Sequence, residues 1–209
     1  MILYNSLTKV WRFFSRINDK IFRKGGDFSD WMNQSELGFS DKCGNKYQPS
    51  SGKIIYALKQ LNISNEDCIL DIGCGKGRAM YMMSGFPFKI IDGFDLSDKM
   101  VEIANLNFNK VGISNRCKAF KADAANFKDF SQYDFFYAFN PVPKDVFKKL
   151  LVNIVNDIKK NPRKCIFIYM NPEYDDYLQK ETPFILFKTI KSMIKWNDIY
   201  VYMYDGMRG

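Results

Sequence analysis

Short apolar runs alternate with amphipathic stretches along most of this chain. Runs typical of β-strands occupy residues 67–72, 88–95, 117–122, 133–139 and 164–170. Segments with helical periodicity lie at residues 51–62, 77–84, 97–111 (with Ser97 as N-cap) and 143–160. Strands that alternate with crossover helices form a parallel sheet covered on both faces. The pattern therefore predicts an α/β protein with a doubly wound, mostly parallel sheet.

The C-terminal end breaks this alternation. Two strand-like runs, "FILFKTIKSM" and "DIYVYMY", are separated by a few polar residues around Trp196. No helix fits between them, so we expect an antiparallel β-hairpin that completes the sheet. No apolar stretch approaches the roughly 20 residues that a membrane-spanning helix needs.

The N-terminal region is predicted to be a helical extension, residues 1–45, ahead of a domain at residues 46–209. A helix over residues 8–24 gathers apolar side chains on one stripe and basic side chains mostly opposite, and Gly25 and Gly26 end it. Three roles fit this basic, aromatic helix: a cap over the active site, a peripheral contact with an anionic surface such as membrane or RNA, or packing of its aromatic stripe onto the core.

Composition narrows the classes of function. The 209 residues are 46% hydrophobic and 16% aromatic, which predicts a packed domain and excludes a disordered chain. The chain has no histidine, which excludes hydrolases with an imidazole base and most transition-metal sites. Five cysteines without a C-x-x-C pair argue against a disulfide framework and a zinc site.

The net charge and the N-terminal sequence bear on the possible partners and on the cellular location. The formal net charge of +8 is spread along the chain, which permits an anionic partner without requiring one. The first residues lack the order of basic, apolar and small-residue regions that marks a signal peptide. We therefore expect a cytoplasmic protein.

The first predicted strand runs into a loop with three glycines at alternate positions, "DIGCGKG". Gly73, Gly75 and Gly77 allow positive φ angles and let the backbone approach a ligand closely. The loop lies at the start of a helix, where free N–H groups point at a ligand, and at the edge of a parallel sheet where ligands bind. These features predict a nucleotide-like ligand.

The spacing and charge of this loop narrow the choice of ligand. Its G-x-G-x-G spacing differs from the G-x-G-x-x-G of dinucleotide-binding folds. Asp71 precedes the first glycine by two positions, and its negative charge would repel a pyrophosphate and attract a cation. We therefore expect a positively charged nucleoside without phosphates. S-adenosylmethionine, which carries an ammonium and a sulfonium, is such a ligand.

Residues 46–209 resemble the class I S-adenosylmethionine-dependent methyltransferases, whose fold is Rossmann-like. "ILDIGCGKGR" is similar to their first motif, "IDGFDLS" to the second and "FKADAANF" to the third. The resemblance implies that Asp95 holds both ribose hydroxyls, with Leu96 beside it, and that Asp123 faces the adenine amino group, with Ala124 next to it. The C-terminal hairpin is similar to the family's reversed seventh strand.

The glycine loop and the resemblance together give a set of expected cofactor-binding residues, and the composition predicts no metal. This set is Tyr47, Asp71, Gly73, Cys74, Gly75, Gly77, Asp95, Leu96, Asp123, Ala124 and Asn140. Tyr47 stands in "KYQPS", a segment that folds over the cofactor in relatives, although plain packing explains it equally well. Lys76 and Arg78 are interpreted as solvated residues at the start of a helix.

The stretch "FNPVPKD", after the fourth strand, carries information about the methyl acceptor. It resembles the [N/D/S]-P-P-[F/Y] motif of methyltransferases that act on amino groups, where the Asn side-chain oxygen and the next carbonyl accept hydrogen bonds from the NH₂. Asn140 and Pro141 match and are the expected catalytic residues, whereas Val142 and Pro143 depart from the motif. The alternative is that this stretch only ends a strand and starts a helix. A second Asn-Pro pair begins at Asn171 and could line the same crevice.

Two other functions stay open beside methyl transfer to an amino nitrogen of a protein, a nucleic acid or a small molecule. An NAD(P)-dependent oxidoreductase needs a pyrophosphate site, and Asp71 argues against one. A non-catalytic nucleotide-binding partner protein would keep the fold without turnover. The three acids Asp71, Asp95 and Asp123, all in register with the motifs, argue against that alternative.

Overall fold

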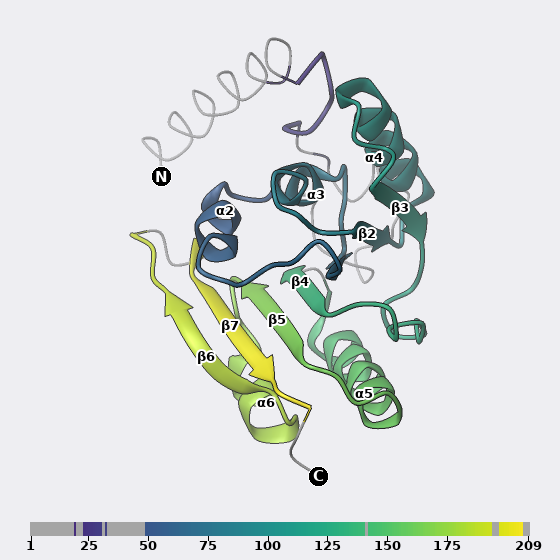
Figure 1. Cartoon of the computed structure of the whole chain (residues 1–209). Coiled ribbons are helices and arrows are strands. Elements are labelled where there is room, and N and C mark those ends of the chain that lie inside the picture. Colours follow the sequence, from purple (N-terminus) through teal and green to yellow (C-terminus); the bar gives the residue numbers. More distant parts are fainter. Residues whose placement is uncertain are drawn as a thin grey trace, which may run out of the picture.

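A seven-stranded sheet organises the part of the chain that the computed structural model describes, which is residues 19, 23–30, 32, 49–140, 142–193 and 197–206. The strand order is β3-β2-β1-β4-β5-β7-β6. The strands are β1 (Cys68–Ile72), β2 (Ile90–Asp95), β3 (Cys117–Lys121), β4 (Phe135–Phe139), β5 (Cys165–Met170), β6 (Ile185–Ile190) and β7 (Ile199–Tyr204). The first five are parallel, and β7 runs antiparallel between β5 and β6 (Figure 1).

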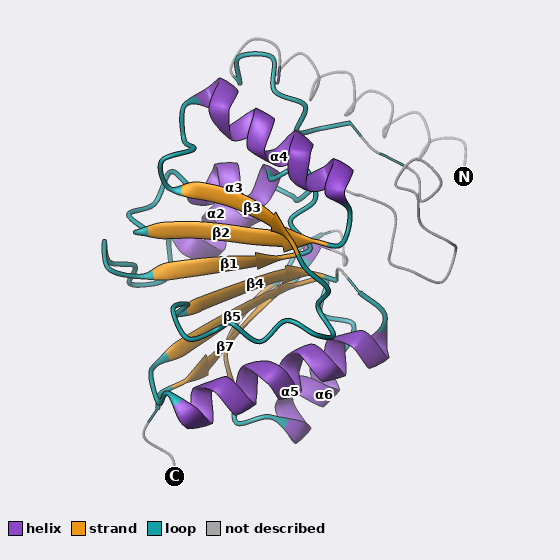
Figure 2. Ribbon diagram, turned by 90° about the vertical axis from the view of Figure 1, so that its right-hand side faces the viewer, coloured by secondary structure: helices purple, strands orange, loops and turns teal. Residues whose placement is uncertain are grey.

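Helices cover both faces of this sheet (Figure 2). They are α2 (Lys53–Leu58), α3 (Arg78–Met83), α4 (Asp98–Val111), α5 (Lys144–Lys160) and α6 (Asp175–Glu181). Helices α2, α3 and α4 contribute to one hydrophobic cluster, and α5 and α6 contribute to the other. The expectation of a doubly wound, mostly parallel sheet with an antiparallel C-terminal hairpin is therefore confirmed.

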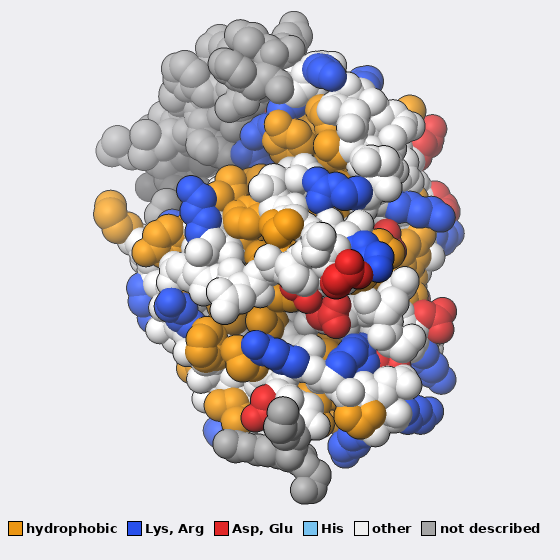
Figure 3. All heavy atoms as spheres, in the orientation of Figure 1, with side chains coloured by type: hydrophobic (Ala, Val, Ile, Leu, Met, Phe, Trp, Pro, Cys, Tyr) orange, Lys and Arg blue, Asp and Glu red, His pale blue; other side chains and the backbone are white. Residues whose placement is uncertain are grey.

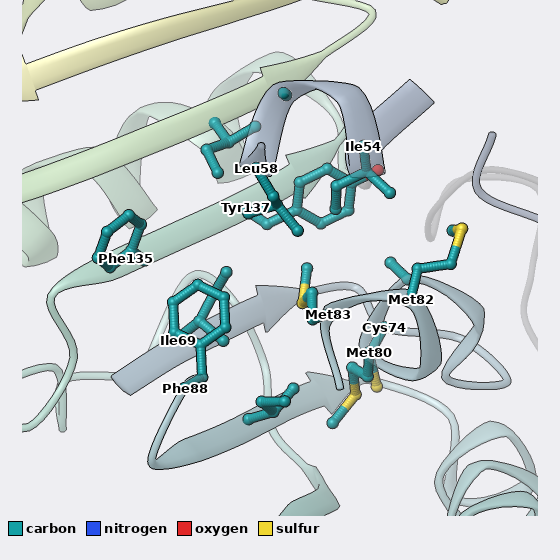
Figure 4. Packing of buried hydrophobic residues seen from close by; sticks show 14 of the residues in the cluster. Ile54, Leu58, Ile69, Cys74, Met80, Met82, Met83, Phe88, Phe135 and Tyr137 are labelled. Atoms are coloured by element: carbon teal, nitrogen blue, oxygen red, sulfur yellow. The ribbon is translucent and has the colours of Figure 1, made fainter. Parts of the chain in front are cut away.

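The central strands are apolar on both faces because both faces are covered. Alternate residues of β1 separate cleanly, with Ile69 in the cluster under α2 and α3 and Leu70 in the cluster under α5. The same alternation places Tyr137 of β4 in the first cluster and Phe136 in the second. Figure 4 shows the first cluster, where side chains of α2 and α3 meet those of the strands. Continuous apolar runs are the sequence pattern of such doubly covered strands.

The order of the strands creates a natural ligand site. The chain moves outward from β1 to β2 and β3, then returns to β4 on the other side of β1. At such a switch point the connections leave in opposite directions and open a crevice at the carboxyl ends of the strands. The glycine loop follows β1 and Asn140 follows β4, so both lie at this edge of the sheet.

Within the described residues, the predicted strands and helices are present in the structure, but some of their end residues differ. The five predicted strands are present, with ends that shift by no more than two residues. Ser97 does occupy the N-cap position of α4, but its side chain makes no capping hydrogen bond. Helix α6 is absent from the prediction, since its seven residues are too few to show a clear period.

Several predictions concern residues outside the described part of the chain. These are most of the helix at residues 8–24, Tyr47 in "KYQPS", Pro141 and Trp196. The division into residues 1–45 and 46–209 stays a prediction for the same reason. No helix among the described residues is long and apolar enough to cross a membrane. The cytoplasmic location also stays a prediction.

The surface shows how the net positive charge is distributed. On the face drawn in Figure 3, Lys and Arg side chains are scattered among uncharged and hydrophobic ones and do not gather in one patch. This agrees with the even spread of charge along the sequence. We accordingly give this face no role in binding an anionic partner.

Candidate functional site

The glycine loop adopts the left-handed backbone that its sequence predicts. Gly73, Gly75 and Gly77 have φ angles of 72°, 52° and 78°. Gly77 could not carry a side chain without a clash, because an added Cβ would lie 2.4 Å from the Phe108 ring of α4. The third glycine is therefore required both by its φ angle and by the close approach of α4.

The N–H groups of this loop do not point freely at a ligand, and the expectation that they do is wrong. The N–H groups of Gly73 and Cys74 both donate to the carbonyl of Phe94, each at 2.9 Å, and that of Gly75 donates to Asp95 Oδ2 at 3.0 Å. The Gly77 N–H donates to the Cys74 carbonyl at 2.9 Å. The loop therefore binds tightly to the end of β2, and these four N–H groups are already used within the protein.

Asp71 is a buried carboxylate with an oxygen that has no partner. Its side chain lies at the end of β1 and the residue is 2% exposed. Among the described residues, Oδ2 of Asp71 is the buried side-chain oxygen or nitrogen that lacks a hydrogen bond. Burial, and secondarily the charge of Asp95, raise the pKa of Asp71 well above its usual value. An ionised carboxylate in this position is stabilised by a cation.

Asp95 joins the loop to the second strand. Its Oδ2 accepts from the Gly75 N–H and its Oδ1 accepts from the Ser97 N–H at 2.9 Å. Burial raises the pKa of Asp95, while these hydrogen bonds lower it. Each carboxylate oxygen can accept more than one hydrogen bond, so Asp95 keeps acceptor capacity for hydroxyl groups of a ligand.

A tyrosine of β4 forms the wall beside Asp71. Tyr137 is the neighbour of Asp71 in the strand register, so both side chains point to the same face of the sheet. The Tyr137 hydroxyl lies 2.7 Å from the hydroxyl of Ser50 and donates to Met170 Sδ at 3.5 Å. In Figure 4 its ring lies beside Ile54 of α2. The sequence pattern did not predict that Ser50 and Tyr137 belong to the site. Tyr137 stands within an apolar run, where a tyrosine is usually a core residue.

Leu96, Asp123 and Ala124 follow the strands β2 and β3 at the same edge. Leu96 is exposed and Ala124 is buried. The Asp123 carboxylate is exposed and stabilises its own turn, since it accepts from the Ala125 N–H at 2.9 Å and from the Asn126 side chain at 2.6 Å. Its expected contact with an adenine amino group stays a prediction.

Two asparagines lie side by side at the ends of β4 and β5. Asn140 and Asn171 directly follow the paired residues Phe139 and Met170, and both have positive φ angles, 39° and 52°. The Tyr169 hydroxyl donates to Oδ1 of Asn140 at 3.4 Å. The Asn171 side chain instead donates to Glu173 Oε1 at 3.1 Å. The two asparagines are therefore neighbours at the ends of adjacent strands, and the expectation that both line one crevice stays a prediction.

The interpretation of Lys76 and Arg78 as solvated residues is wrong. Both are buried polar residues. The Lys76 ammonium forms an ion pair with Asp27 at 2.6 Å, and Arg78 donates to the carbonyl oxygen of Ser50 at 2.9 Å. Their partners come from the segment before α2. Only the tertiary arrangement brings that segment to the loop, so the local sequence carries no signal for it.

The described cysteines are buried and reduced. Cys68, Cys74, Cys117 and Cys165 are buried free thiols. Burial, followed by the charges of Asp95 and Asp71, raises the pKa of the Cys74 thiol well above its usual value, so this thiol stays protonated and unreactive, and its contact with a cofactor stays a prediction. Among the described residues, no group of three or more His, Cys, Asp or Glu could hold a metal ion.

Comparison with known proteins identifies similar sequences. The family described as "Methyltransferase domain" matches residues 69–161. A sterol 4-C-methyltransferase of Caenorhabditis elegans is 38% identical over 85 residues. That match covers 40% of this chain and 25% of the relative, so the chain spans only a quarter of the length of that protein.

Solved structures support the fold. An RNA methyltransferase from Salinibacter ruber in complex with S-adenosyl-L-homocysteine superposes with a TM-score of 0.54 at 13% identity, over 75% of this chain and 94% of that one. A TehB-like S-adenosylmethionine-dependent methyltransferase from Corynebacterium glutamicum gives a TM-score of 0.53 at 15% identity, over 76% of this chain and 89% of that one. Identities this low establish a shared fold and no shared substrate.

Proposed function

We propose that this chain, whose residues 69–161 match the methyltransferase-domain family, is a class I S-adenosylmethionine-dependent methyltransferase that transfers a methyl group to an amino nitrogen. The acceptor would be an amine of a protein, a nucleic acid or a small molecule. The observation that carries the proposal is the buried Asp71 carboxylate with an unpartnered oxygen beside a glycine loop.

The residues present fit a cationic nucleoside better than a dinucleotide. A pyrophosphate is bound by free backbone N–H groups, and four N–H groups of this loop already donate within the protein. The unpartnered Asp71 oxygen is an acceptor, which suits an ammonium and repels a phosphate. These features support S-adenosylmethionine as the cofactor and argue against an NAD(P)-dependent oxidoreductase.

Each residue of the site has a role that follows from its chemistry. When bound, S-adenosylmethionine supplies an electrophilic methyl group on a positively charged sulfur. Asp71 would hold the cationic methionine end and Asp95 the ribose hydroxyls, while Asp123 would accept from the adenine amino group. The acceptor nitrogen would gain the methyl group as the methyl–sulfur bond breaks, and S-adenosylhomocysteine would leave. The one proton lost from the nitrogen would pass to water when the amine binds in its neutral form. No side chain then has to act as a dedicated base.

Asn140 would orient the acceptor. It lies at the end of β4, beside the loop that follows β1, and its carboxamide oxygen can accept a hydrogen bond from an NH₂ group. The Tyr169 hydroxyl already donates to this oxygen and so limits rotation of the side chain. Orientation of the reacting groups is the main contribution that a protein makes to such a transfer. Pro141, the next residue of the motif, would contribute its carbonyl oxygen.

Asn140→Ala tests this role. We expect affinity for S-adenosylhomocysteine to stay within about twofold of the wild type, because the other cofactor-binding residues stay in place, while methyl transfer falls by about tenfold or more, because the contact with the acceptor is lost. Calorimetry measures the first quantity and transfer of labelled methyl the second. Asn140→Gly is the matched comparison, since glycine removes the same side chain without strain at the φ angle of 39°. A loss in Asn140→Ala that Asn140→Gly does not share would assign the effect to the backbone and remove Asn140 from the acceptor site.

The proposed activity is tested by binding and transfer together. Calorimetry with S-adenosylhomocysteine and with NAD should give binding of the first compound only. Incubation with methyl-labelled S-adenosylmethionine and fractionated cell extract should label one acceptor class. Binding of NAD alone would support the oxidoreductase, and cofactor binding without any labelled product would support the non-catalytic partner. A label attached to carbon, as the name of the sterol relative suggests for that protein, would contradict the amino acceptor.

Cofactor binding should depend on pH through Asp71. Its folded-state pKa is raised, so between pH 3.8 and the folded pKa the folded protein holds a proton that the unfolded chain does not. In that window the stability of the free protein falls as pH rises, whereas affinity for a ligand that presents an ammonium, as S-adenosylhomocysteine does, rises because binding requires the ionised carboxylate. We expect affinity for S-adenosylhomocysteine to fall by about tenfold per pH unit below this pKa. Calorimetry in buffers of different ionisation enthalpy should detect the proton that Asp71 releases when the ligand binds. Binding that does not change with pH would contradict the assignment of Asp71 as the carboxylate that holds the ammonium.

A further inference from the structure

The segment of residues 23–30 meets the glycine loop at a junction that includes α4. The Lys76 ammonium lies 2.6 Å from Oδ2 of Asp27, and the Lys76 side chain is 2% exposed. Asn107 of α4 donates to the carbonyl oxygens of Asp27 and Lys76, each at 3.0 Å. The Asp27 N–H donates back to Asn107 Oδ1 at 2.8 Å. Three segments far apart in the sequence therefore meet at the residue between the second and third glycines.

Arg78, the first residue of α3, forms a second connection. Its Nε donates to the Ser50 carbonyl at 2.9 Å, and its guanidinium also donates to the Ser29 hydroxyl at 2.5 Å. The Ser50 hydroxyl in turn lies 2.7 Å from the hydroxyl of Tyr137, the strand neighbour of Asp71. The residues ahead of the sheet therefore reach both the glycine loop and the wall beside the buried carboxylate.

The segment is itself packed. Phe28 is fully buried and its ring lies 5.1 Å from that of Tyr81 in α3. The Phe28 N–H donates to Oδ2 of Asp19 at 3.1 Å. The Arg23 guanidinium lies 5.9 Å from the Phe28 ring centroid and 5.3 Å from that of Tyr81, which adds cation–π contacts. Residues 23–30 are thus an ordered support against α3.

A loop rich in glycine needs such support. Lys76 is flanked by Gly75 and Gly77, and glycine can adopt many backbone conformations at similar energy. The loop sequence alone therefore permits its shape without fixing it. A buried ammonium, in contrast, is stable only where its partners hold it, because an unpaired buried charge is costly. The Lys76–Asp27 pair and the Asn107 contacts therefore add to the hydrogen bonds that join the loop to the end of β2.

We propose that Lys76 and Arg78 are positioning residues, which use residues 23–30 and Ser50 to hold the glycine loop in its cofactor-binding conformation. The proposal rests on the function proposed above, since it concerns the same site. Neither side chain has to contact the cofactor. Residues 23–30 then belong to the cofactor-binding unit, although the sequence assigns them to a separate N-terminal extension.

Lys76→Met in the full-length chain tests the proposal. Methionine keeps the apolar stem and removes the charge, so we expect affinity for S-adenosylhomocysteine to fall by about tenfold. Lys76→Arg keeps the ion pair and should recover affinity to within about threefold. Lys89→Met is the control, because it breaks an exposed ion pair with Glu66 before β2 and should change nothing. Amide hydrogen exchange supplies a second readout: the Gly75 N–H should exchange faster in Lys76→Met relative to the amides of β5.

The outcomes separate the two proposals. If the wild-type chain does not bind S-adenosylhomocysteine, the proposed function is wrong and this inference fails with it. If the wild type binds and folded Lys76→Met binds equally tightly, the positioning role is wrong and the proposed function stands. Should Lys76→Met not fold, Asp27→Asn provides the second variant, because Asp27 is partly exposed; unchanged affinity in folded Asp27→Asn would equally contradict the proposal.

Discussion

Replacing Asp71 by Asn should lower affinity for S-adenosylhomocysteine by about 100-fold without lowering the stability of the protein. The loss corresponds to about 2.7 kcal/mol, the scale of a buried charge pair that loses one partner. The free energy of unfolding should not fall, because the free protein holds this carboxylate buried with an unpartnered oxygen. The substitution should therefore weaken the free energy of cofactor binding without lowering the free energy of unfolding, as expected for a buried charge whose partner is a ligand.

A second carboxylate of the sheet provides the control for this experiment. Asp92 of β2 is half-buried, its pKa is also raised mainly by burial, and it accepts a hydrogen bond from the Tyr133 hydroxyl at 2.8 Å. Asp92→Asn should leave cofactor affinity unchanged, because this group already has a partner within the protein. Calorimetry gives the affinities and denaturant unfolding the stabilities. Equal affinities of Asp71→Asn and wild type would contradict the central role of Asp71.

Replacing Gly77 by Ala should lower the free energy of unfolding by about 3 kcal/mol. Part of the loss is the strain of placing a side chain at a φ angle of 78°. The larger part is the overlap of the new Cβ with the Phe108 ring, whose nearest atoms would lie 2.4 Å and 2.5 Å away. Both residues are held by packed elements, so neither can move without disturbing the first hydrophobic cluster.

Gly112→Ala separates these two contributions. Gly112 has the same φ angle of 78°, but a Cβ added there meets nothing within 4 Å. We expect a loss of only about 1 kcal/mol, which measures the backbone strain alone. Unfolding of both variants in denaturant gives the difference between the two free energies. If Gly77→Ala were as stable as Gly112→Ala, the close contact between Gly77 and the Phe108 ring of α4 would be contradicted.

The predictions from the sequence succeeded where the signal is local. Strand and helix positions follow from the alternation of apolar residues, which records which faces are covered. The positive φ angles of Gly73, Gly75 and Gly77 follow from the residue type itself, since only glycine adopts them without strain. The acid before the first glycine is likewise visible as a charge in an apolar run. Such properties belong to single residues and their immediate neighbours.

Predictions failed where a property depends on a partner distant in the sequence. Lys76 and Arg78 look solvated, yet Asp27, Ser29 and Ser50 bury them. The loop N–H groups look free, yet the end of β2 accepts the hydrogen bonds from three of them.

The sequence by itself determined a doubly wound sheet, a left-handed glycine loop after its first strand and an acid two residues before the first glycine of that loop. Only the tertiary structure decided that this acid has an unpartnered oxygen, that the loop offers few N–H groups to an anion, and that residues 23–30 support it. The physical reason is that burial and hydrogen-bond satisfaction are set by which segments meet. The fold, and no local pattern, brings those segments together.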